Sequence, residues 1–291
     1  MSAKVRLTML NAMAAGDFEQ ALDRHAQWGL TDLDLKDQIF GKGILELDDK
    51  DVERAASLIQ ARGLAVNTLS TVLFQNDIDT ERAKLEADLH HGVPRAIEIC
   101  RILKPQQVRL IAARTSRRSG SDGLVEYLQR NQPWVLPIYR AAVDGLRAAG
   151  QQAVIENECH ACIFGCTADV VEFFAALDRP GQVGFIWDIQ NLWQMGEFPS
   201  LAAYEQLKPL IRHCHLKGGQ HDGATIRLRW STALEDASWP VLEIVRRVVA
   251  DGVVPVICLN PSHGERKAGY NYEGVVERDI AFLRREVPGI Q

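Results

Sequence analysis

Short apolar runs alternate along the chain with longer segments whose apolar residues recur every three or four positions. A short apolar run is typical of a strand buried on both faces, and the longer spacing predicts an amphipathic helix. The expected strands are Val5–Asn11, Thr31–Asp37, Ala65–Val72, Gln107–Ala113, Ala153–Glu158, Val183–Gln190, Ile211–Lys217 and Val254–Asn260. The expected helices are Asp17–Trp28, Asp49–Arg62, Glu81–Leu103, Val125–Ala149, Thr167–Leu177, Leu201–Leu210, Trp239–Ala250 and Tyr272–Arg285.

Strict alternation of these strands and helices predicts an α/β fold with a parallel sheet and crossover helices. An open doubly wound sheet would also alternate in this way. However, the segment Leu10–Gly16 after the first strand lacks the G-x-G-x-x-G pattern of a dinucleotide site. We therefore predict one (β/α)8 TIM barrel, a single domain over residues 1–291, which is close to the usual barrel length of roughly 250 residues.

Composition and charge indicate which kinds of partner the protein is expected to bind. The chain is 46% hydrophobic and 24% charged, as in ordinary globular enzymes, and its formal charge of −5 disfavours nucleic acid as a partner. No stretch approaches the roughly 20 apolar residues that cross a bilayer, and Lys4 and Arg6 fall where a signal peptide would need its apolar run. We expect a cytoplasmic protein with no membrane partner, in which Cys100, Cys214 and Cys258 are buried thiols. A homo-oligomer remains possible.

Polar and ionisable residues end the fifth to eighth expected strands. In order along the chain, these ends carry Glu156 and Glu158, Asp188, His215 and Lys217, and Asn260. Catalytic groups of a TIM barrel lie at the carboxyl ends of its strands, and buried ionisable groups are costly unless they are paired or bind a metal. The sequence therefore predicts a functional site built from these four strand ends.

These strand ends resemble those of the xylose isomerase-like TIM barrels, the superfamily of sugar phosphate isomerases and epimerases. That family has an E-N-H-like motif after strand five, D-x-x-H after strand six, H-x-H-x-K-D on strand seven and a Glu on strand eight. The resemblance implies that Glu156, Asp188 and His215 bind a divalent ion, Mn²⁺, Mg²⁺, Co²⁺ or Zn²⁺, with Asn260 at the fourth position. Two carboxylates and an imidazole suit such ions.

Three departures from the family pattern bear on the reaction. Asn260 replaces the strand-eight Glu, Asn191 replaces the His after strand six, and Gly218 replaces the Asp after Lys217. An amide offers an oxygen but cannot act as a base at neutral pH, so epimerisation by two bases is disfavoured.

Three further residues are catalytic candidates. Glu158 lies two residues after Glu156 and faces the same side, so it is a possible base, although an ion pair with Arg114 is an alternative. Lys217 could polarise a substrate oxygen or be solvated. His263, after Asn260, could replace the missing acid or be a surface-loop histidine.

Substrate contacts are expected from residues near the same strand ends. The resemblance implies a small carbohydrate substrate, and the candidates are Trp187, Asn191, Arg227 and Arg229. Aromatic rings stack on sugars, but Trp187, Trp193, Trp230 and Phe164 fit core packing equally well. His213 is expected to pack or to support a ligand. Cys159, Cys162 and Cys166 are more consistent with incidental thiols than with a metal cluster, which would need a fourth ligand.

We expect a metal-dependent isomerase or epimerase that moves a proton next to the carbonyl of a sugar, polyol or keto-sugar. A dehydratase or lyase with one base, or a non-catalytic sugar-binding barrel with a degraded metal site, are the alternatives. A DNA repair nuclease of the same superfamily is disfavoured, because the strand ends Thr68–Thr71 and Ala112–Arg114 supply none of its extra His and Asp ligands.

Overall fold

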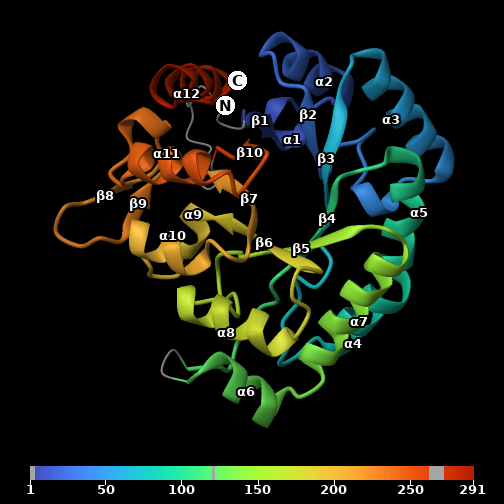
Figure 1. Ribbon diagram of the computed structural model, residues 1–291. Helices are drawn as coiled ribbons and strands as arrows, with labels where there is room; N and C mark the ends of the chain where they lie inside the picture. The colour runs from blue at the N-terminus through green and yellow to red at the C-terminus, as the bar shows by residue number, and fades with distance from the viewer. Residues whose placement is uncertain (1–3, 120–121, 262–271) are drawn as a thin grey trace.

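Eight parallel strands form a nearly closed barrel surrounded by helices in the computed structural model (Figure 1). The structure describes residues 4–119, 122–261 and 272–291. The barrel strands are β1 Arg6–Met9, β2 Asp32–Leu35, β3 Ala65–Ser70, β4 Gln107–Ile111, β5 Gln152–Glu156, β6 Val183–Asp188, β7 Ile211–Leu216 and β10 Val256–Leu259. All eight predicted strands are confirmed, and the TIM-barrel fold with them.

The strands follow the order β1, β10, β7, β6, β5, β4, β3 and β2, each hydrogen-bonded in parallel to the next. Two contacts bring the outer strands of this ladder together. Leu10 forms a parallel bridge with Asp34, and the Thr8 hydroxyl donates a hydrogen bond to the Asp32 carbonyl oxygen over 2.7 Å. The ends of the chain also lie together, since the Gln291 amide donates to the Val5 carbonyl oxygen (Figure 1).

Helices surround the barrel, and the longer ones bury an apolar face. They are α1 Asn11–Ala14, α2 Phe18–Gln27, α3 Asp49–Ala61, α4 Arg82–Ala87, α5 Val93–Leu103, α6 Leu124–Asn131, α7 Val135–Ala148, α8 Thr167–Leu177, α9 Ile189–Gln194, α10 Leu201–Leu207, α11 Val241–Asp251 and α12 Tyr272–Glu286. A short hairpin of β8 Gln220–His221 and β9 Leu228–Trp230 extends from the loop after β7.

Two of the predicted helices are divided in the structure. The segment predicted as Val125–Ala149 contains α6 and α7, which are separated at Pro133. Proline disfavours the helical conformation in the residue before it, and Gln132 has left that conformation with φ −137° and ψ 54°. The segment predicted as Glu81–Leu103 contains α4 and α5 joined by a π-helical turn, Asp88–Gly92.

The barrel interior is unusually polar for a protein core. Asp34, Glu156, Asp188, His213 and His215 are each at most 1% exposed. Because buried charges require partners, these residues must form a connected network, and they lie where the functional site is expected. In the described part of the chain, no helix combines the length and apolar character needed to cross a bilayer.

Away from the barrel interior, Asp279 on α12 makes stability depend on pH. Burial raises the pKa of this carboxyl to about 7, although it accepts a hydrogen bond from the Leu234 amide over 2.7 Å. Among the charged neighbours, Arg278 opposes this shift, whereas Asp236 and Glu235 add to it.

The folded state therefore holds a proton that the unfolded chain, with an ordinary pKa near 3.8, has lost. We expect this group to lower stability as the pH rises from about 4 to 7, by at most about 1.4 kcal/mol per pH unit. Asp279→Asn keeps an acceptor for Leu234 and should remove this dependence. Urea unfolding of both proteins across this range measures it; parallel curves would contradict the prediction.

Candidate metal and active site

A cavity of about 240 Å³ opens at the carboxyl ends of the barrel strands. Its position agrees with the general placement of active sites in this fold. Its lining combines carboxylates and cations with a few apolar side chains, namely Leu10, Met13, Lys36, Arg109, Glu156, Glu158, Cys159, His160, Asn191, Gln194, Lys217 and Asn260. The predicted site residues Glu156, Glu158, Asn191, Lys217 and Asn260 therefore meet in one cavity.

Glu156, the last residue of β5, is held between two cationic side chains. Its Oε2 accepts a hydrogen bond from the Arg109 guanidinium over 2.5 Å, and its Oε1 lies 2.7 Å from Nδ1 of His215. Burial alone would raise the pKa of this carboxyl, but the charges of His215 and Arg109 outweigh it and hold the pKa well below the usual range. Glu156 is therefore ionised, with both oxygens directed at positive groups.

Asp188 ends β6 and also begins α9. Its Oδ1 accepts a hydrogen bond from the Asn191 amide over 2.9 Å, which caps the helix, and its Oδ2 lies 2.6 Å from Nζ of Lys217. One oxygen of Asp188 therefore caps α9, while the other pairs with Lys217 of the cavity lining. Lys217 is buried rather than solvated: burial lowers its pKa, but Asp188 outweighs this and keeps the ammonium charged.

His215 joins the two carboxylates. It pairs with Asp188 in the β6–β7 ladder, and its Nδ1 lies 3.7 Å from Oδ2 of Asp188. Burial lowers the pKa of this imidazole, but the negative charge of Glu156 outweighs it and raises the pKa well above the ordinary value. One ligand atom each from Glu156, Asp188 and His215 lies within 4.8 Å of the others, a spacing suited to a metal ion.

Asn260 completes this set, which we call the mouth site: Glu156, Asp188, His215 and Asn260. Its Nδ2 lies 3.2 Å from Nδ1 of His215, while its buried Oδ1 has no hydrogen-bond partner among the residues that the structure describes. A buried oxygen without a partner is costly, and coordination of a cation would satisfy it. Two carboxylates, an imidazole and an amide oxygen therefore fit a divalent metal ion.

Glu158 lies at the cavity wall, beyond the mouth site. It is partly exposed, and none of the ion pairs among the described residues involves it, so the alternative pairing with Arg114 is not formed. Burial and, next, the negative charge of Glu156 raise the pKa of its carboxyl. Glu158 is thus the carboxylate in this cavity whose oxygens remain available.

Only some of the predicted substrate-binding residues lie at or near the cavity. Asn191 lines the cavity, where its Oδ1 accepts a hydrogen bond from Lys217 over 2.9 Å. Arg227 lines a neighbouring hollow that shares His160 and Gln194 with the cavity. Arg229 instead pairs with Asp222 in the exposed hairpin over 2.6 Å.

The tryptophan expected at the mouth belongs to the core. Trp187 is 1% exposed and stacks on Tyr204 of α10, so it faces away from the cavity. Successive side chains of a strand point to opposite faces, and Asp188 takes the inward direction. Phe164 and Trp193 are likewise buried, whereas Trp230 is exposed on the hairpin.

The last candidates are His263 and the three cysteines of the loop after β5, namely Cys159, Cys162 and Cys166. Cys159 lines the cavity wall and Cys162 is buried, and burial raises the pKa of these thiols to about 11 and 12. Within the described ranges, neither these two nor Cys166 joins a group of residues with metal-ligand spacing, which supports the incidental-thiol interpretation. His263 lies outside the described residues.

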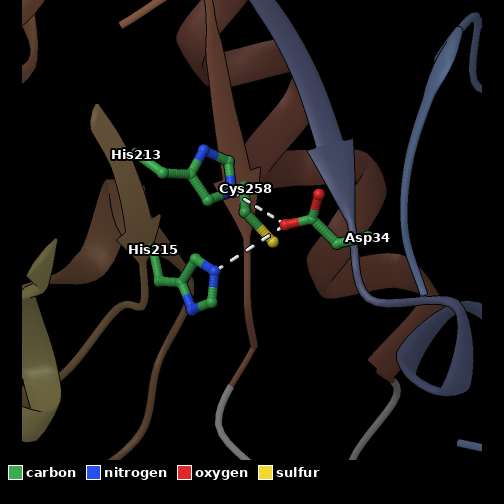
Figure 2. Close-up of side chains that lie close together, drawn as sticks. All are labelled: Asp34, His213, His215 and Cys258. Carbon is green, nitrogen blue, oxygen red and sulfur yellow. Dashed lines mark hydrogen bonds and ion pairs between the residues drawn. The ribbon is translucent and has the colours of Figure 1, made fainter. Parts of the chain in front are cut away.

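Three residues of the barrel interior were not predicted from the sequence. Arg109 on β4 binds Glu156. Asp34 on β2 and Cys258 on β10, which was expected only as a buried thiol, lie beside His215 (Figure 2). A signal was present, because Arg109 stands between apolar residues in β4 and Asp34 alternates with leucines in β2. Neither residue lies at the carboxyl end of its strand, where the fold predicts catalytic groups.

A family comparison agrees with this geometry. The model of the xylose isomerase-like TIM barrel family matches residues 22–286. The chain belongs to this family. A comparison with curated proteins gives no significant match.

Solved structures of other xylose isomerase-like TIM barrels are similar over almost the whole chain. One from Mycobacterium smegmatis, in complex with magnesium, has a TM-score of 0.69 and 17% identity, covering 97% of this chain and 96% of that chain. The apo 3-keto-D-glucoside 4-epimerase of E. coli has a TM-score of 0.70 and 15% identity, covering 97% and 100%. D-allulose 3-epimerase from Methylomonas sp., in complex with D-allulose, has a TM-score of 0.72 and 11% identity, covering 98% and 100%. At these identities the likeness concerns the fold.

Proposed function

We propose that this protein is a divalent-metal-dependent enzyme that moves a proton next to the carbonyl of a small sugar, polyol or keto-sugar, as isomerases and epimerases do. The observation that carries the proposal is the convergence of Glu156, Asp188 and His215 beside a cavity whose wall holds Glu158, a carboxylate that forms no ion pair with any described residue. The magnesium and D-allulose complexes of structurally similar proteins support it.

The mouth site would hold the ion through Glu156, Asp188, His215 and Asn260. A bound divalent ion supplies Lewis acidity, which stabilises negative charge on the oxygens of an enediolate. Arg109 and Lys217 already neutralise one oxygen of Glu156 and one of Asp188. The site therefore combines two fixed cations with the ion, and together they favour a negatively charged intermediate over the neutral substrate.

Glu158 is the base in this proposal. Its carboxylate removes the proton from the carbon next to the substrate carbonyl and can return it to the carbonyl carbon, while the hydroxyl proton of the substrate passes to the former carbonyl oxygen. Lys217, which lines the cavity, donates a hydrogen bond to a substrate oxygen and holds the substrate in place. Arg227, in the neighbouring hollow, contacts the far end of a longer substrate. The catalytic role of His263 and the substrate-binding role of Arg229 stay predictions.

One catalytic carboxylate favours a proton shift on one face of the substrate over inversion, which needs a base on each face. Asn260 occupies the position from which the second family carboxylate would act, and its amide cannot take up a proton. The same observation favours a second candidate, β-elimination of water by a one-base dehydratase. In that reaction Glu158 would again remove the proton next to the carbonyl and would return it to the hydroxyl group on the following carbon, which leaves the substrate as water.

The test is a panel of keto-sugars and polyols incubated with protein reloaded with Mn²⁺ after chelation. We expect turnover that requires the ion, with products identified by NMR: an isomer supports the first candidate and a dehydrated product the second. Asp188→Asn keeps an oxygen to cap α9 but removes the carboxylate charge, so it should weaken Mn²⁺ binding and lower turnover. Turnover that persists after chelation, or Mn²⁺ binding unchanged by Asp188→Asn, would contradict the proposal.

A further inference from the structure

A second group of potential metal ligands lies beneath the mouth site. It consists of Asp34, His213, His215 and Cys258, which we call the deep cluster, and all four are at most 1% exposed. One ligand atom from each lies within 4.8 Å of those of the other three. The side chains come from β2, β7 and β10 and point toward one another inside the barrel (Figure 2).

Both imidazoles of the deep cluster present Nε2 to the same carboxylate oxygen. Oδ2 of Asp34 lies 2.7 Å from Nε2 of His213 and 3.8 Å from Nε2 of His215. The Nε2 atom of His215 is buried and has no hydrogen-bond partner in the described part of the chain. An unsatisfied nitrogen inside a protein is costly, and here it is aimed at an oxygen and a sulfur that could share a cation with it.

The other polar atoms of these ligands are already held by neighbours. Nδ1 of His213 lies 3.0 Å from the Val256 carbonyl oxygen, and Nδ1 of His215 lies 2.7 Å from Glu156. Oδ1 of Asp34 accepts a hydrogen bond from Asn67 over 3.0 Å. A histidine that binds a metal usually donates its second ring N–H to a carbonyl or carboxylate, which leaves the first nitrogen for the ion. Both histidines of the deep cluster have this arrangement.

We propose that the deep cluster is a second metal site, selective for Zn²⁺, in which Asp34, Nε2 of His213, Nε2 of His215 and the thiolate of Cys258 bind one ion. A thiolate with two imidazoles and a carboxylate is a typical tetrahedral zinc set, whereas Mg²⁺ and Mn²⁺ prefer oxygen ligands. The charges balance, because one Zn²⁺ neutralises one carboxylate and one thiolate. Binding releases the thiol proton of Cys258 to solvent.

The two sites share His215 through opposite ring nitrogens. When Nε2 binds an ion in the deep cluster, Nδ1 keeps its hydrogen and donates it to Glu156, as the 2.7 Å distance allows. Binding at the mouth site instead requires the lone pair of Nδ1. Zinc in the deep cluster should therefore weaken Mn²⁺ binding at the mouth site.

Cobalt titration of the chelated full-length protein tests the proposal, because a thiolate ligand gives Co²⁺ a charge-transfer band in the near ultraviolet. We expect the band in the wild type, its loss in Cys258→Ser, and its retention in Cys214→Ser. Cys214 is the matched control, since it is also buried on β7 but alternates with His213 and His215 and is not in the cluster. One equivalent of Zn²⁺ should displace the cobalt and remove the band.

Further variants separate this proposal from the proposed function. Glu156→Gln removes a carboxylate of the mouth site but still accepts from His215, so it should keep the band while losing Mn²⁺ binding. Asp34→Asn preserves the shape of the cluster and should weaken cobalt binding at least tenfold, even if Cys258→Ser does not fold. A wild type without the band, or a band equally strong in Cys258→Ser, would refute the deep site and leave the mouth site standing.

Discussion

Replacement of Glu158 by Gln is expected to lower kcat about 10² to 10⁴-fold with an unchanged affinity for Mn²⁺. The expectation rests on the proposed reaction: Glu158 lines the cavity, forms no ion pair with a described residue and lies outside the mouth site. A glutamine of the same shape fills its place but cannot take up a proton at neutral pH. The measurements are steady-state kinetics on a substrate found in the keto-sugar panel and Mn²⁺ titration of each protein.

Two controls make the Glu158 result specific. Glu158→Asp keeps a base but shortens it, so it should retain part of the activity that the Gln variant loses. Glu172→Gln replaces a glutamate on the exposed face of α8, outside the cavity, and should leave kcat unchanged. Equal kcat for wild type and Glu158→Gln would remove Glu158 from the mechanism, and Lys217 and His263 would then be the remaining candidates for proton transfer.

The fold and the mouth site could be predicted because both depend on regular features of the sequence. Apolar runs alternating with helical spacing define the strands, and parallel strands place all their carboxyl ends at one rim. Glu156, Asp188 and His215 therefore had to meet if the barrel closed. The β6–β7 ladder, which sets Asp188 opposite His215, brings the last two together.

The deep cluster could not be predicted in the same way, because it depends on which face of each strand turns inward. Strands covered on both faces carry apolar residues on each, so the pattern does not distinguish inside from outside. The β2–β3 pairing also shifts register between Leu33 and Asp34, and β6–β7 shifts between Phe185 and Ile186. A shift of this kind changes which residues are opposed, and the sequence carries no clear mark of it.

The direction of the Trp187 side chain could be predicted from the sequence. Once Asp188 is assigned to the barrel interior, the alternation of a strand directs Trp187 to the helix layer, where it stacks on Tyr204. The contact of Arg109 with Glu156 could be predicted from charge, not from strand alternation. A guanidinium in the middle of a buried strand needs a carboxylate partner, and Glu156 on the adjacent strand was already a candidate.

Loss of one partner of the buried Arg109–Glu156 pair should strongly destabilise the metal-free barrel. Arg109 and Glu156 are 3% and 1% exposed at their side chains, and Arg109 also donates hydrogen bonds to the carbonyl oxygens of Ser70 and Thr71. Glu156→Gln leaves the guanidinium buried beside a neutral amide, and the expected loss is about 3 to 5 kcal/mol.

A double-mutant cycle with Arg109→Met separates the pair from the individual side chains. Removing both charges should cost less than the sum of the single losses, because neither charge is then left alone in the interior. The exposed pair of Arg95 and Asp49, joined over 2.9 Å, is the matched control, and its loss should cost about 0.2 to 1 kcal/mol. Urea unfolding of the metal-free proteins gives all of these values. If Glu156→Gln costs no more than the surface control, the interior pair contributes little, and the barrel must be held mainly by its apolar layers.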